Sequence, residues 1–155
     1  MSRGRLFGRE EFDPSYIILQ ILSLQSVFYT TQATLTVLFN QLFGLKRDLL
    51  QVLSAESFEF WDSYSLVAVL VTCLTSPILV LALVFVVERA SKCLDFSVTI
   101  FIVHAVLVCA YKGFPLELAW WVLQIVNLGS VVLVAEFICL KIEQQEIVLS
   151  SKQEV

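Results

Sequence analysis

The chain has 155 residues, of which 58% are apolar and 15% are charged, and its mean hydropathy is +0.84. Water-soluble domains contain about 45–50% apolar and about 25% charged residues, so this composition excludes an ordinary soluble domain and requires lipid as the main solvent. The net charge of −4 gives no support for nucleic-acid binding.

Charged residues are confined to short segments of the chain. Four long stretches between them contain no Asp, Glu, Lys or Arg, namely 14–45, 63–87, 96–111 and 118–135. A helix needs about 20 apolar residues to cross a bilayer, whereas buried strands and helices of soluble cores are shorter. The pattern therefore predicts an all-α, polytopic membrane protein.

The predicted architecture is a single bundle of four transmembrane helices. The spans are expected at about 16–44, 64–87, 94–112 and 118–140. Residues 1–12 and 146–155 are expected to be flexible ends. The arginines near the start are followed by acidic residues and no cleavage site closes the first stretch, so the first span is expected to remain in the mature protein.

The first span carries a polar stripe. Gln25, Tyr29, Gln32 and Thr36 recur at helical spacing and share one face. We interpret this face as hydrogen-bonding contacts between helices, and a substrate path is the alternative interpretation.

The first connection, 45–62, has two predicted features. Its beginning places four aliphatic residues at helical spacing against charged and amide residues, which predicts a short amphipathic helix on the lumenal bilayer surface. The aliphatic residues are Leu45, Leu49, Val52 and Leu53. Aromatic residues then gather near the starts of the second and fourth spans, where they are expected to anchor the interface. They are Phe58, Phe60, Trp61, Tyr64, Trp120 and Trp121.

The third span contains His104, the only histidine of the chain. We expect it to be a packed structural residue rather than part of a proton relay, with Gln124 and Asn127 of the fourth span as candidate partners. Asp95 is expected to cap the start of the third helix by accepting backbone N–H bonds.

The four cysteines, at positions 73, 93, 109 and 139, form no C-x-x-C motif. We interpret them as small packing residues. Palmitoylation of Cys93 or Cys139, near the cytosolic interface, is the alternative.

The distribution of Lys and Arg predicts the orientation. Seven of them lie in the N-terminal segment, the second connection and the tail, and three lie in the first and third connections. The positive-inside rule therefore places both termini in the cytosol.

No enzyme signature is present in the sequence. There is no paired carboxylate within a span, no H-E-x-x-H, no G-x-S-x-G and no glycine-rich phosphate loop, so we expect no catalytic residue, metal, cofactor or small-molecule substrate. A small four-helix transporter and a structural membrane scaffold remain alternatives to a docking protein.

Several short elements carry a resemblance to a known family. The chain has F-D-P at 12–14, K-C-L-D-F-S-V-T at 92–99, F-P-x-x-x-x-W-W-x-x-Q at 114–124 and E-F-I-C-L at 136–140. In this order and spacing, residues 12–149 resemble the Sys family of Golgi-localised integral membrane proteins. The resemblance implies four spans, residence in the trans-Golgi membrane, and a receptor that recruits an ARF-like small GTPase through its acetylated N-terminal segment.

The docking surface that this role requires is expected at the cytosolic ends of the helices. We expect the lining to be apolar, from Phe12, Tyr16, Leu94, Phe96, Phe137 and Leu140. Arg89 and Lys92 would stand at the rim beside Asp95. The alternative is that the apolar residues face lipid and the two cations only set the topology.

Overall fold

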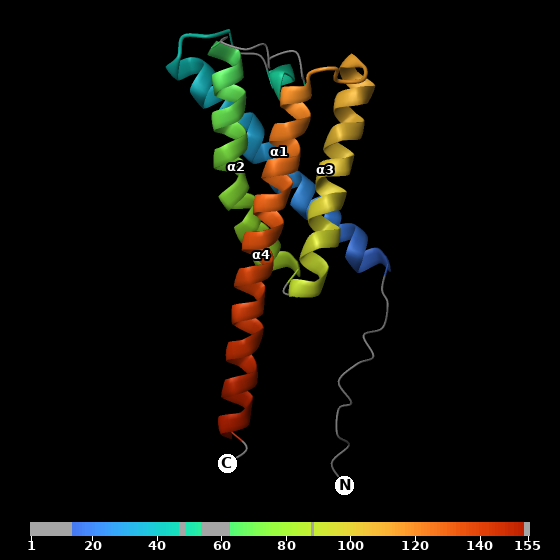
Figure 1. Ribbon diagram of the computed structural model, residues 1–155, viewed down its shortest axis with the longest axis vertical. Coiled ribbons are helices and arrows are strands. Elements are labelled where there is room, and N and C mark those ends of the chain that lie inside the picture. The colour runs from blue at the N-terminus through green and yellow to red at the C-terminus, as the bar shows by residue number, and fades with distance from the viewer. Residues whose placement is uncertain (1–13, 47–48, 54–62, 88, 154–155) are drawn as a thin grey trace.

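The computed structural model describes residues 14–46, 49–53, 63–87 and 89–153. Its elements are α1 (Pro14–Leu42), the 3-10 helix η1 (Leu49–Leu53), α2 (Ser63–Val87), α3 (Ala90–Lys112) and α4 (Leu118–Gln153). The α-helices run alternately up and down (Figure 1), as expected when short connections join neighbouring helices. The prediction of an all-α chain is confirmed.

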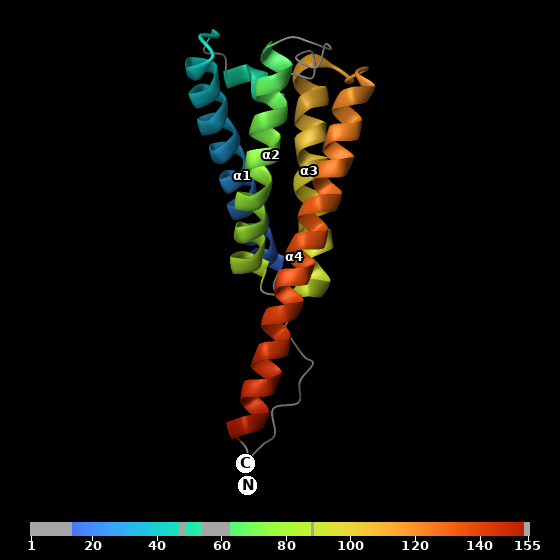
Figure 2. The ribbon, with the colours of Figure 1, turned by 60° about the vertical axis from the view of Figure 1, so that its left-hand side comes forward.

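This topology gives the bundle two distinct ends. The start of α1, the end of α2, the start of α3 and the lower part of α4 lie at one end, referred to below as the α2–α3 end (Figure 1). The end of α1, η1, the start of α2 and the α3–α4 turn lie at the other, referred to as the η1 end. Figure 2 shows that α4 continues well past the other helices at the α2–α3 end.

Three of the described helices are long and apolar enough to cross a membrane, by length and composition. They are α2, α3 and α4, over Ser63–Val87, Ala90–Tyr111 and Leu118–Gln145. The sequence predicted four transmembrane helices, and α1 does not meet this criterion. Its 29 residues give sufficient length, but its glutamine, threonine and asparagine side chains lower its hydropathy.

The polar residues of α1 are turned into the bundle. Gln25, Gln32, Thr36 and Asn40 are all buried, and Leu24 and Phe28 are buried beside them. Gln25 donates from Nε2 to the carbonyl oxygen of Ile100 in α3 at 3.4 Å. The predicted role of this face in contacts between helices is confirmed for Gln25.

Small residues allow α3 and α4 to approach closely near the α2–α3 end. Cys93, Ala135 and Cys139 are essentially inaccessible, and they belong to an apolar cluster to which all four α-helices contribute. Close approach of backbones through small side chains is the usual basis of helix association in lipid. The predicted role of Cys93 and Cys139 as packing residues is confirmed.

The start of α3 differs from the prediction. The helix begins at Ala90, so Asp95 lies inside it and cannot be its cap. Arg89 occupies the N-cap position without a side-chain cap bond. The Ala90 N–H instead donates to Oε1 of Glu143 in α4 at 3.0 Å. A carboxylate from another helix thus satisfies a backbone donor at the N-terminus of α3 and complements its dipole.

We expect Glu143→Ala to lower the free energy of unfolding in detergent by about 1 kcal/mol, the usual cost of losing a helix cap. Asp95→Ala is the control, because an exposed substitution away from a cap usually changes stability by less than about 0.5 kcal/mol. Thermal or denaturant unfolding followed by circular dichroism measures both. Equal losses in the two variants would contradict the capping role of Glu143.

A tight turn joins α3 to α4. Gly113 has φ +89°, a conformation that favours glycine, and its N–H donates to the carbonyl oxygen of Cys109 at 3.0 Å at the end of α3. Nε1 of Trp121 donates to the carbonyl oxygen of Pro115 at 3.0 Å at the entry into α4.

Candidate functional site

The predicted docking residues that are exposed lie at the α2–α3 end. Tyr16, Leu94, Phe137 and Leu140 each expose about half or more of their surface. Phe12 lies outside the described residues. These large apolar side chains are available for contact with lipid or with a partner.

Phe96 corrects the predicted lining. It is only 7% exposed and belongs to the apolar cluster between the helices, because it points into the bundle while Leu94 points away from it. The polar members Arg89, Lys92 and Asp95 are exposed in the first turns of α3 and just before it. The backbone carbonyl of Asp95 accepts a bond from Oγ1 of Thr99 at 2.7 Å, an ordinary contact within the helix.

Lys141 is part of this surface and was missed by the sequence prediction. Its Nζ lies 4.7 Å from the centroid of the Phe137 ring, one turn earlier on α4. A cation over an aromatic face is attracted by the ring quadrupole. The i, i+4 spacing of Phe137 and Lys141 is readable in the sequence and could have indicated the pair.

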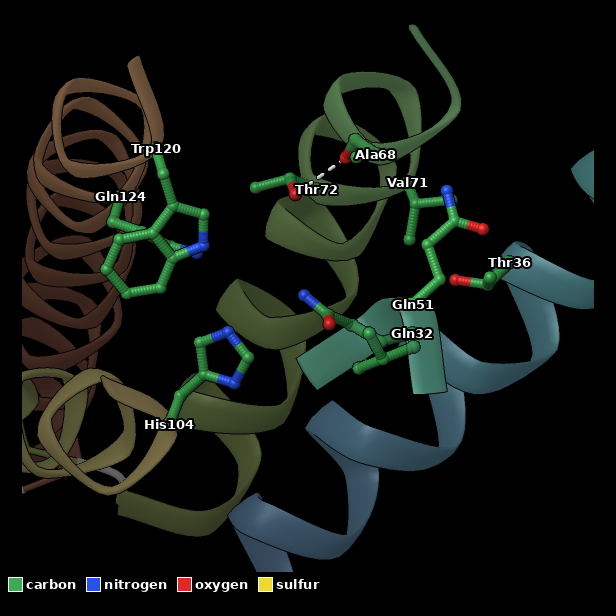
Figure 3. A pocket seen from close by; sticks show the side chains of 10 residues that line it. Gln32, Thr36, Gln51, Ala68, Val71, Thr72, His104, Trp120 and Gln124 are labelled. Atoms are coloured by element: carbon green, nitrogen blue, oxygen red, sulfur yellow. Dashed lines mark hydrogen bonds between the residues drawn. The ribbon is translucent and has the colours of Figure 1, made fainter. Parts of the chain in front are cut away.

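A second candidate site is a polar cavity inside the bundle towards the η1 end. All four α-helices and η1 contribute to its lining, which consists of Gln32, Thr36, Gln51, Val52, Ala68, Val71, Thr72, His104, Trp120 and Gln124. Figure 3 shows Gln32, His104 and Trp120 around a common space. The volume of about 30 Å³ is enough for one or two water molecules.

His104 anchors the cavity wall from α3. It is 2% exposed, and its Nδ1 lies 3.3 Å from the Tyr29 hydroxyl of α1. Its ring packs edge-on against Phe28, with centroids 5.4 Å apart. Asn127, one of its two predicted partners, instead pairs with Ser76 of α2. That part of the prediction is wrong, since Asn127 faces α2.

Gln51 of η1 closes the cavity at the η1 end. Its Oε1 accepts from Nδ2 of Asn40 at 2.9 Å, and its Nε2 donates to the carbonyl oxygen of Tyr64 at 3.2 Å. Gln51 thus joins the end of α1 to the start of α2. The predicted amphipathic helix is a 3-10 helix of five residues in the structure, and its position on a bilayer surface stays a prediction.

The chemistry of this cavity favours hydration over substrate transport. Oε1 of Gln124, which lines it, is buried without a protein hydrogen-bond partner. Buried polar atoms of this kind are commonly satisfied by ordered water. The volume of the cavity suits one or two water molecules and gives no support to a substrate path, so we keep the interpretation of the polar stripe as contacts between helices.

We expect Tyr29→Phe to lower the free energy of unfolding by about 1 kcal/mol, because the variant leaves the His104 nitrogen without its hydroxyl partner. Tyr111→Phe is the matched control, since Tyr111 is 45% exposed near the end of α3. Denaturant unfolding of both variants in the same detergent makes the comparison. If the two variants lose the same stability, the Tyr29–His104 contact contributes nothing specific.

Cys93 and Cys139 face one another across the α3–α4 contact. Their Sγ atoms are 3.5 Å apart, and the Cys93 thiol lies 3.4 Å from the carbonyl oxygen of Arg89, to which it donates. Because both side chains are buried between helices, this arrangement disfavours the alternative that either one is palmitoylated. Cys73 is exposed and Cys109 is partly buried. Within the described ranges, no group of three or more His, Cys, Asp or Glu residues is placed to hold a metal.

The fold and the interior together define a helical integral membrane protein with its polar side chains gathered inside the bundle. The family model SYS1, described as integral membrane protein S linking to the trans Golgi network, matches residues 7–149. The chain belongs to this family, as the resemblance in its sequence indicates. It is therefore an integral membrane protein of the trans-Golgi network.

Relatives from distant organisms show the same likeness. A Protein SYS1 homolog of Nematostella vectensis is 33% identical over 145 residues, which cover 94% of this chain and 92% of the relative. A homolog of Dictyostelium discoideum is 30% identical over 89% of this chain and 60% of its own length. Protein SYS1 of Saccharomyces cerevisiae is 33% identical over 84% and 64%. No solved structure matches the chain.

Proposed function

We propose that this protein is a four-span receptor of the trans-Golgi membrane that recruits an ARF-like small GTPase and so supports vesicle trafficking. The observation that carries the proposal is membership of the SYS1 family over residues 7–149. The exposed apolar and charged side chains at the α2–α3 end supply a surface of suitable chemistry. The GTPase is expected to present its acetylated N-terminal segment to this surface.

The proposal takes α1 as the fourth span despite its lower hydropathy. The face of α1 that carries Gln25, Gln32 and Asn40 is buried, whereas Ile18, Leu22 and Leu38 on its outer side are more than half exposed. Lipid would therefore meet aliphatic side chains while the polar groups lie inside the bundle. Nε2 of Gln25 and Nδ2 of Asn40 donate to protein acceptors there, as polar groups of a span require.

The orientation follows from the positive-inside rule. It places the α2–α3 end, with Arg89, Lys92 and Lys141, on the cytosolic side, and η1 on the lumenal side. The exposed Lys46 then belongs to the lumenal surface. A cytosolic partner would meet the α2–α3 end and the projecting part of α4.

We expect a cysteine introduced at Gln145 to react with an impermeant thiol reagent in intact, right-side-out Golgi vesicles. A cysteine at Lys46 should react only after the membrane is permeabilised, because the reagent cannot reach the lumen. Both positions are exposed in the structure, so side-chain burial does not distort the comparison. Labelling at 46 with protection at 145 would reverse the orientation, and the unsubstituted chain gives the background from its own cysteines.

An embedded receptor would supply a second membrane-binding signal to a GTPase that has only one of its own. A single amphipathic segment or one lipid chain binds membranes weakly, and stable anchoring takes two signals. Tyr16, Leu94, Phe137 and Leu140 offer apolar contacts for such a segment. Arg89 and Lys92 would meet acidic groups of the GTPase, which adds mainly to association rate and selectivity.

We expect the double variant Arg89→Glu, Lys92→Glu to reduce the GTPase bound to Golgi membranes by about tenfold or more, since like charges across an interface are unfavourable by several kcal/mol. Lys46→Glu, a charge reversal at the η1 end, is the control and should leave the bound fraction unchanged. Quantitative immunoblotting of Golgi fractions measures both, after fractionation confirms that each variant reaches the Golgi.

Two outcomes separate the parts of the proposal. Normal recruitment by the double variant would remove Arg89 and Lys92 from the docking surface while leaving the receptor role open to other residues. Normal recruitment in cells that lack the whole protein would refute the receptor role itself. Flux measurements in proteoliposomes address the transporter alternative independently of the GTPase.

A further inference from the structure

The contact between Cys93 and Cys139 is more specific than packing requires. The two thiols lie 46 positions apart in the chain, on α3 and α4, and their Sγ atoms are 3.5 Å apart. The hydrogen bond from the Cys93 thiol to the Arg89 carbonyl fixes the rotamer that points Cys93 at α4. Bond formation would require the sulfurs to approach from this contact to about 2.05 Å, the length of a disulfide bond.

Contacts on both sides of Cys139 hold α3 and α4 in register beside the two cysteines. The Ala90 N–H binds Glu143 one turn beyond Cys139, and Ala135 packs one turn before it. Cys93 lies in the first turn of α3, so the pair is close to the α2–α3 end rather than at the middle of the bundle. A small neutral oxidant can reach this depth when the first turn of α3 opens, because helix ends are the least stable parts of a helix.

We propose that Cys93 and Cys139 form a reversible redox pair whose disulfide clamps α3 to α4. The pair is a dithiol under the reducing conditions of the cytosol, where disulfides are transient and belong to catalytic or redox-sensing sites. Oxidation closes a loop that contains the rest of α3, the turn at Gly113 and the first half of α4. Closing such a loop restricts the unfolded chain and stabilises the helical hairpin.

With a peroxide as the oxidant, formation of the disulfide is a balanced reaction. The thiolate of one cysteine attacks a peroxide oxygen, the O–O bond breaks, and a sulfenic acid forms with release of hydroxide. The second sulfur then attacks the sulfenic sulfur, the S–S bond forms, and the S–O bond breaks with release of a second hydroxide. The two thiol protons convert both hydroxides to water, so two thiols and one hydrogen peroxide give one disulfide and two waters. A thiol reductant reverses the step by exchange.

The clamp lies beneath the surface described above, because both cysteines are buried. Leu94 follows Cys93, and Leu140 follows Cys139, so the disulfide fixes the spacing of two helices that carry exposed apolar residues. Regulation of GTPase docking by this clamp rests on the proposed function, whereas the thiol chemistry does not. The two are therefore measured separately.

The test uses the full chain in lipid nanodiscs and two matched variants. The first, Cys73→Ser with Cys109→Ser, keeps only the proposed pair, and the second, Cys93→Ser with Cys139→Ser, keeps only the other two cysteines. Each is treated with hydrogen peroxide, denatured, alkylated with N-ethylmaleimide and analysed by intact mass and peptide mapping. In the first variant both cysteines should become unavailable to N-ethylmaleimide, and the protein itself should lose about 2 Da. This loss should be at least about tenfold faster than any in the second variant, and dithiothreitol should restore both alkylation sites.

The outcomes decide the proposal. Persistence of both free thiols in the first variant, or oxidation to sulfinic acid without a disulfide, would show that the pair is only a packing contact and overturn it. A disulfide that forms equally fast in both variants would overturn the role of the observed contact. The oxidised first variant should also unfold at a higher temperature than its reduced form, and an unchanged temperature would refute the clamp.

Recruitment is measured on Golgi membranes that carry the first variant, before and after oxidation. A disulfide with unchanged GTPase binding would refute the regulatory link and leave the redox pair in place. Absence of GTPase binding in both states would count against the proposed function, while the mass measurement would still decide the thiol chemistry.

Discussion

The polar stripe of α1 must be buried, and the arrangement of much of the η1 half of the bundle depends on this burial. In hydrocarbon an unpaired amide or hydroxyl costs several kcal/mol, so Gln25, Gln32 and Asn40 are stable only where protein groups or water meet them. Nε2 of Gln25 donates to the backbone of Ile100, Nδ2 of Asn40 donates to Gln51, and Gln32 lines a small cavity beside His104. Oε1 of Gln25 and Oδ1 of Asn40 are buried without a protein hydrogen-bond partner. The position of η1 across the end of the bundle follows from the same need, because Gln51 supplies the acceptor for Asn40.

The other half of the bundle is held together differently. Near the α2–α3 end the interior is apolar, and Cys93, Ala135 and Cys139 bring α3 and α4 into close contact. Leu94 and Leu140 each follow a buried cysteine, and the turn of about 100° per residue in a helix points them away from the contact, so they are exposed. The packing of the small residues brings the two thiols together.

Periodicity along the sequence predicted the structural features that depend on one helix alone. The charge-free stretches gave the positions of the helices, and the spacing of Gln25, Tyr29 and Gln32 gave the buried face of α1. Features that depend on two helices were missed, because spacing within one helix does not reveal its neighbour. Glu143 reaches Ala90 across 53 positions, and Cys139 reaches Cys93 across 46. Asp95 was assigned as a cap because the helix start was placed too late, and Phe96 was assigned to the surface for the same reason.

The junction where α4 leaves the bundle is tied to α3, and this bears on how the α2–α3 end could act. Glu143 ties α4 to the start of α3, and Lys141 covers the ring of Phe137 on α4 itself. The helix then continues without interruption to Gln153. A backbone fixed in this way loses less conformational entropy when a partner binds than a mobile backbone would. For the receptor proposed above, whose partner would bring a segment that folds as it binds, more of the entropic cost would then fall on the partner.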